Sequence, residues 1–238
     1  MANRSNGSRT STLARLWLPE GAPDAPNSRT RIFLGNHLWL FLALASVVGF
    51  AAGLASGLFV FTWNEWNSPS FGAFIAPPAL LGWLALRPRQ AAVIGLVTLV
   101  AAVGGHFLGA QFNGYEQNDL EYRAWVTIGV LLGPLLGYLG HTLRSRRLIA
   151  RAVCAGLLIG WIYVPFYLGF SLESEYYVEN TNTVTRLFDL SMIMLVLSVC
   201  RGLVARITAL VCAALFLWPL TTMSVLNSVL LWRAGGGL

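Results

Sequence analysis

The chain alternates between long runs of apolar residues and short polar segments, and seven of the apolar runs approach the length of a membrane-spanning helix. A spanning helix needs roughly 20 mostly apolar residues. We therefore predict an all-α integral membrane protein, a bundle of about seven transmembrane helices. The predicted spans are 38–61, 66–86, 91–112, 124–143, 152–170, 182–200 and 207–232.

Two of these spans are irregular. The second has a short apolar core and contains Pro77 and Pro78, which lack the main-chain N–H that a helix uses. Its outer end is therefore predicted to be kinked or unwound. The sixth span contains Arg186 and Asp189, and charges are costly inside a bilayer. A count of six spans therefore remains an alternative to seven.

The charged residues change sign from one connection to the next. Arginines precede the first span and fill the connections after spans two, four and six, whereas carboxylates fill the others. Cytoplasmic loops carry the excess of Lys and Arg, so the N-terminus is predicted to be cytoplasmic and the C-terminus outside. Residues 1–34 are interpreted as a disordered, Arg-rich cytoplasmic tail, and 35–238 as the transmembrane domain.

Composition supports this class and removes others. Hydrophobic residues make up 56% of the chain and charged residues only 11%, where soluble domains average about 25%. All 16 cationic residues are Arg. The absence of Lys excludes a retinal Schiff base and a P-loop. It also favours a GC-rich bacterial source, and we predict the cytoplasmic membrane as the location. The arginines flank the spans, so no nucleic-acid partner is predicted.

The predicted outer surface is acidic and has aromatic neighbours. It is interpreted either as a cation-attracting vestibule or recognition surface, or as ordinary outer loops with an aromatic belt, and the second interpretation is favoured. The carboxylates that form this surface are Glu65, Glu116, Asp119, Glu121, Glu173, Glu175 and Glu179.

Polar residues within the spans define a candidate site. The candidate outer-leaflet pocket consists of His106, Gln111, Arg123, Arg186 and Asp189. Asp189 and Arg186 are three residues apart and can pair on one helix face. Charges at membrane depth are a functional hypothesis by default. The simpler alternative is that Asp189 pairs with Arg186 alone and that His106 bonds a neighbouring helix.

No catalytic or cofactor chemistry is predicted. The chain lacks a G-x-S-x-G motif, two His residues four apart and a C-x-x-C motif. The three cysteines lie in or beside apolar runs, where Cys usually behaves as a small hydrophobe. We therefore predict no metal site, no cofactor and no enzymatic activity.

Glycines recur every four residues in three spans, which places them on one helix face. This spacing favours close packing inside the bundle over a homodimer seam, and Gly53 and Gly133 are predicted at close contacts. No internal repeat is visible, so an inverted-repeat transporter is not supported. The repeating positions are Gly49, Gly53 and Gly57, then Gly129, Gly133 and Gly137, then Gly156 and Gly160.

Two segments resemble a known family. They read APPALLGWLALRPRQAAVIGLVTLVAAVGGHFLGAQFNGY and WVTIGVLLGPLLGYLGHTLR. They are similar to the bacterial, mainly actinobacterial, membrane family catalogued as domain of unknown function 6518. That family has no assigned activity, so the resemblance implies no catalytic residue.

The leading interpretation is therefore a non-enzymatic binding or accessory subunit in the membrane. Its expected partners are the lipid bilayer and either another membrane protein or further copies of this chain. The alternative is a small-solute transporter or permease component that uses the candidate outer-leaflet pocket.

Overall fold

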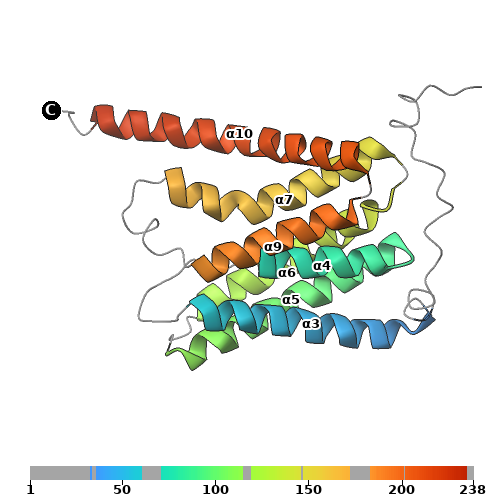
Figure 1. Cartoon of the computed structure of the whole chain (residues 1–238). Helices are drawn as coiled ribbons and strands as arrows, with labels where there is room; N and C mark the ends of the chain where they lie inside the picture. The colour runs from blue at the N-terminus through green and yellow to red at the C-terminus, as the bar shows by residue number, and fades with distance from the viewer. Residues whose placement is uncertain are drawn as a thin grey trace, which may run out of the picture.

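A computed structural model describes the backbone at residues 33, 36–60, 71–114, 119–145, 147–171, 183–200 and 202–234. Side chains are described at 33, 36–58, 71–114, 119–145, 147–163, 187–200 and 202–219. Seven helices make up the described elements (Figure 1). They are α3 (Leu38–Val60), α4 (Phe71–Leu84), α5 (Pro88–Phe112), α6 (Asp119–Thr142), α7 (Leu148–Ser171), α9 (Thr183–Val199) and α10 (Leu203–Ala234).

Each predicted span coincides with one of these helices, and the fold is all-helical over the part described. Three helical segments are long and apolar enough to cross a membrane: Leu38–Leu58, Pro88–Phe112 and Asp119–Thr142. Shorter apolar helices occur at Phe71–Leu84, Leu148–Tyr163, Leu187–Val199 and Leu203–Pro219.

One boundary prediction was wrong. Helix α6 begins at Asp119, five residues before the predicted start at 124, so Asp119 and Glu121 lie in its first turn. Carboxylates are favourable there because the N-terminal end of a helix is electropositive. Helix α4 is continuous from Phe71 through Pro77 and Pro78, so the prolines do not interrupt it, whereas residues 66–70 at the outer end of the predicted span lie outside the described residues. Prolines are tolerated in this way where neighbouring helices support the backbone.

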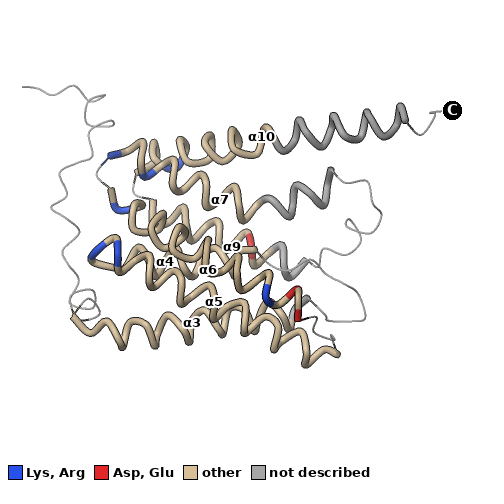
Figure 2. The backbone as a smooth tube through the Cα atoms, turned by 180° about the vertical axis from the view of Figure 1, so that it is seen from behind, with Lys and Arg blue, Asp and Glu red and all other residues tan. Residues whose placement is uncertain are grey.

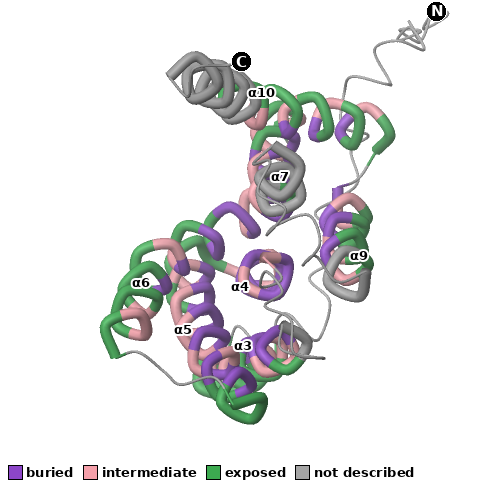
Figure 3. Tube along the Cα trace, turned by 90° about the vertical axis from the view of Figure 1, so that its left-hand side faces the viewer, coloured by how far each residue is buried: buried purple, intermediate pink, exposed green. Residues whose placement is uncertain are grey.

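The short helix α4 is the centre of the bundle. It packs against α3, α5, α6, α7 and α9, and Figure 3 shows it surrounded by them. Both prolines and most other α4 residues are buried. Helix α10, by contrast, packs extensively only on α7 among the described helices. The molecule therefore has a central helix and a peripheral one.

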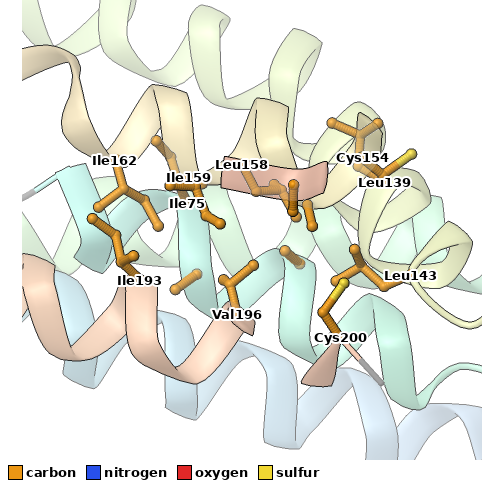
Figure 4. Packing of buried hydrophobic residues seen from close by; sticks show 14 of the residues in the cluster. Ile75, Leu139, Leu143, Cys154, Leu158, Ile159, Ile162, Ile193, Val196 and Cys200 are labelled. Atoms are coloured by element: carbon orange, nitrogen blue, oxygen red, sulfur yellow. The ribbon is translucent and has the colours of Figure 1, made fainter. Parts of the chain in front are cut away.

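The largest apolar cluster joins α4, α7 and α9, with Ile75, Leu158, Ile162, Ile193 and Val196 facing one another (Figure 4). Leu158, Ile162 and Val196 are completely buried. Lipid tails are as apolar as these side chains, so the cluster stabilises the bundle through van der Waals packing rather than through removal from water.

The glycine prediction was confirmed. A Cβ added at Gly53 would collide with the main-chain oxygen of Ala102, and at Gly133 it would lie 2.7 Å from the Cα of Leu96. Gly49 and Gly57 meet the carbonyls of Thr98 and His106 in the same way. The backbones of α3 and α5 therefore approach along a continuous glycine face.

Charge separates along the bundle, as Figure 2 shows. Arginines whose side chains are described gather at the end where α4 joins α5, α6 joins α7 and α9 joins α10, and among these Arg123 of α6 is the exception. Described carboxylates lie toward the opposite end. We call the first the arginine end. The predicted tail at 1–34 falls almost entirely outside the described residues, and the sidedness of the bundle stays a prediction.

Candidate functional site

A buried hydrogen bond to a carboxylate joins α9 to the start of α4. The main-chain N–H of Gly72 donates a 2.8 Å hydrogen bond to Oδ1 of Asp189, whose side chain is only 2% exposed. A Cβ at Gly72 would lie 2.5 Å from that oxygen and 3.0 Å from Cγ of Met192. Glycine is therefore the residue that lets the carboxylate reach the helix backbone.

This contact follows from the geometry of helix ends. The first four N–H groups of a helix have no partner inside it, and the helix dipole makes that end electropositive. Helix α4 has 14 residues, so it is about 21 Å long and shorter than a bilayer core of about 30 Å. Its N-terminus needs an acceptor from the protein, and the Asp189 carboxylate supplies one.

At the other end of α4, a histidine and an arginine side chain bind the carbonyl oxygen that follows the helix. The carbonyl oxygen of Ala85, directly after the helix, lies 3.2 Å from Nδ1 of His141 and accepts a 3.5 Å hydrogen bond from Arg144. Donors and cations are favourable at a helix C-terminus. Helix α4 is therefore bound at its first turn by α9 and after its last turn by α6.

Side chains also complete other helix ends. The amide nitrogen of Asn113, after α5, donates to the carbonyl of Leu58 at 3.1 Å. Nε of Arg206 in α10 donates to the carbonyls of Leu197 and Cys200 at 3.1 and 3.0 Å. These contacts tie α5 to α3 and α10 to α9 through terminal carbonyls, which otherwise lack partners.

His106 lies on α5 in an aromatic environment. Its ring makes edge-to-face contacts with Phe74 of α4 and with Phe107, at centroid distances of 5.4 and 5.8 Å. Its Nδ1 is buried and has no hydrogen-bond partner in the structure. The carboxylate of Glu121, in the first turn of α6, lies within electrostatic reach of the ring.

The described contacts place the predicted pocket residues on two sides of α4. His106 reaches α4 from α5, and Asp189 reaches it from α9, which has at most slight contact with α5 and α6. Arg123 and Gln111 are exposed. Arg186 belongs to α9, but its side chain lies outside the described residues. A single pocket that joins all five residues stays a prediction.

Sequence reasoning missed Gly72, which provides the described hydrogen bond to Asp189. The two residues are 117 positions apart, so no local spacing relates them. A signal was present nonetheless: Gly72 lies close before the short apolar core of the second predicted span, and a carboxylate inside a span requires a partner.

The acidic surface is described only in part. Asp119 is exposed and Glu121 half-buried, both in the first turn of α6. Glu65, Glu116, Glu173, Glu175 and Glu179 lie outside the described residues.

Metal-binding residues do not cluster in the part of the chain that is described, where no three His, Cys, Asp or Glu side chains come together. The cysteines are free thiols, with Cys154 and Cys200 buried and Cys212 partly buried. Nothing in this arrangement resembles a nucleophile with an adjacent base.

The long apolar helices and the all-helical bundle define a protein with the features of a multi-pass membrane protein. The chain belongs to DUF6518, a family of unknown function, whose sequence model matches residues 30–229. The match confirms the resemblance and extends it beyond the two segments that indicated it. Comparison with the curated proteins and with the solved structures found no match.

Proposed function

We propose that the protein is a seven-span protein of the bacterial cytoplasmic membrane that acts as a non-enzymatic accessory subunit. In this proposal, α10 docks against a helix of another membrane protein. The observation that supports it is Trp218, which is 70% exposed near the middle of α10. Among the described helices, α10 packs extensively on α7 alone. Lipid-facing Trp residues normally sit at the two membrane interfaces, whereas Trp is enriched at protein interfaces.

The face of α10 indicates the kind of partner. Its small residues Ala205, Ala209 and Ala213 are buried, whereas Leu215 and Trp218 on its other side are exposed and large. Helices approach closely in membranes through small residues. Two copies of this bulky face would pair poorly, so a different helix that presents small residues to Trp218 is the better fit.

A photo-cross-linking residue at 218 or 215 of the full-length chain in its native membrane tests the proposal. Positions 47 and 131 are the controls, because Val47 of α3 and Leu131 of α6 are similarly exposed. We expect one adduct of constant mass from the α10 positions only, and the same adduct when the cross-linker is placed on the partner. An adduct of two copies of this chain, or none at all, would overturn the proposal.

The second candidate function is solute transport through an outer polar pocket. It is favoured by His106, whose buried Nδ1 lacks a hydrogen-bond partner near the Glu121 carboxylate. A His106→Cys variant without the three native cysteines should then react with a membrane-impermeant thiol reagent from outside. If the introduced thiol is protected in the folded protein, no aqueous route reaches this depth and the transport function fails.

A further inference from the structure

Two arginines from different helices converge at the arginine end of the bundle. Arg151 is the fourth residue of α7 and Arg206 the fourth of α10. The two helices pack against each other where Gly156 of α7 meets Ala209 of α10, and each arginine lies within two turns of that contact. Nε of Arg206 donates to the carbonyl of Cys200, which is fully buried directly after α9. Cations are unfavourable in the first turn of a helix, because that end is already electropositive. Two positive charges and two helix N-termini therefore meet at one junction of α7, α9 and α10.

This positive charge has no carboxylate nearby in the sequence. Neither 122–172 nor 190–238, the segments that contain the two arginines, includes an Asp or Glu. The described carboxylates, Asp119, Glu121 and Asp189, belong to the opposite half of the bundle (Figure 2). Glu20 and Asp24 of the predicted tail lie outside the described residues. Among the residues that the structure describes, no carboxylate neutralises this charge, and a bound anion is one counter-charge that would do so.

The donors at the junction are oriented by the fold. Nε of Arg206 is held by the carbonyls at the end of α9, which uses one of the five N–H donors of a guanidinium group. Arg206 itself is exposed, whereas Nε of Arg151 is buried and has no hydrogen-bond partner in the structure. One group is thus anchored and accessible, and the other contains a buried donor without an acceptor.

Exposed apolar side chains flank the two arginines. Ile149 precedes Arg151 by two positions and is 73% exposed, and Leu203 and Ile207 on either side of Arg206 are 70% and 53% exposed. We propose that Arg151 and Arg206 bind the phosphate of an anionic phospholipid, whose acyl chains lie against these residues. Basic sites between transmembrane helices at the cytoplasmic side recognise such head groups. Arg206 and Trp218 are 12 residues apart on α10, about 18 Å along the helix.

Binding of phosphatidylglycerol to the purified full-length protein, with phosphatidylcholine as the zwitterionic reference, tests the assignment by native mass spectrometry. Arg151→Gln should weaken phosphatidylglycerol binding about fivefold, the effect expected of one arginine near the surface, and Arg151→Lys should largely retain binding. Arg89→Gln is the matched control, since Arg89 is an exposed arginine at the same end of the bundle. It should leave binding unchanged.

Three outcomes would overturn the proposal. Equal losses in the Arg151 and Arg89 variants would mean that general surface charge attracts the lipid. Displacement of the lipid by millimolar inorganic phosphate would identify a site for a free anion. Equal binding of phosphatidylglycerol and phosphatidylcholine by the unaltered protein would exclude the site. If Arg151→Gln does not fold, the same lipid titration is carried out with Arg206→Gln, which should also weaken phosphatidylglycerol binding.

Discussion

The carboxylate of Asp189 lies at the N-terminus of α4 and accepts the main-chain N–H of Gly72 at 2.8 Å, 117 positions away in the chain. The bond is buried and links the sixth predicted span to the central helix of the bundle. A charge that is costly at membrane depth is thereby placed where the helix dipole favours it. In this protein Asp189 acts as a cap supplied by another helix.

Replacing Asp189 should destabilise the bundle. Asp189→Ala leaves the N–H of Gly72 without its acceptor in a buried position and should lower the free energy of unfolding by about 1–3 kcal/mol. Asp189→Asn keeps an oxygen acceptor but loses the charge, so its effect should be smaller. Thermal unfolding in detergent measures both, and Asp119→Asn, at an exposed carboxylate in α6, is the control. Equal melting of all variants would contradict the assigned role.

Gly72→Ala should also destabilise, because its Cβ would lie 2.5 Å from the Asp189 oxygen. The two positions share one contact, so their effects should not add, and a coupling of about 0.5–3 kcal/mol is expected. A double-mutant cycle of Gly72→Ala and Asp189→Ala measures it. Strict additivity would show that the two residues act independently.

The apolar runs were sufficient to predict the seven helices, because membrane length and residue type act locally. The start of α6 was missed, since Asp119 and Glu121 are equally typical of a loop and of a first helical turn. The partner of Asp189 could not be predicted from spacing. Arg186 is a close sequence neighbour, whereas the Gly72 amide is brought near only by the packing of α9 on α4.

The neighbour of His106 could not be predicted from the sequence either. Its depth in the third span indicated a polar site, but the sequence does not show which helix its ring faces. The packing of α5 on α4 brings the ring against Phe74. The glycine repeats predicted close helix contacts correctly, because residues four apart lie on one face of a helix whichever helix packs against that face.

Gly53→Ala should destabilise the α3–α5 contact, since the new Cβ would collide with the backbone oxygen of Ala102, which has little room to move. Overpacking of this kind typically costs about 1–3 kcal/mol. Gly104→Ala is the matched control, because a Cβ there meets no atom within 4 Å. Unfolding in detergent should separate the two variants, and equal stability would contradict the close approach.

Gly133→Leu should be more damaging than either alanine variant. A Cβ at Gly133 already lies 2.7 Å from the Cα of Leu96, and the larger side chain would force α5 and α6 apart. The prediction is a loss of monodisperse protein after extraction, measured by size-exclusion chromatography. Gly129→Ala should be tolerated, because its Cβ would make ordinary contacts of 3.6 Å or more with side chains. A Gly133→Leu protein as stable as Gly129→Ala would show that this interface adapts.

The bundle is predicted to cross the membrane with its two termini on opposite sides. In Figure 1 the described part of α3 begins at one end of the molecule and α10 finishes at the other, as an odd number of spans requires. The arginine end contains the start of α5, α7 and α10, and Lys and Arg are retained on the cytoplasmic side. A reporter fused after Leu238 should therefore lie outside the cell and one fused before Met1 inside.

Because α9 carries Asp189 and α4 is short, these two are the helices whose insertion is least favourable on its own. A cytoplasmic reporter after Leu238, with one fused after Arg144 also cytoplasmic, would show that one helix downstream of α6 does not cross the membrane. If the reporter after Arg144 were instead outside, the reporter before Met1 would decide between two cases. A cytoplasmic reporter there would show that α4 does not cross the membrane, whereas an outside reporter would mean that the whole orientation is reversed and that the positive-inside argument fails.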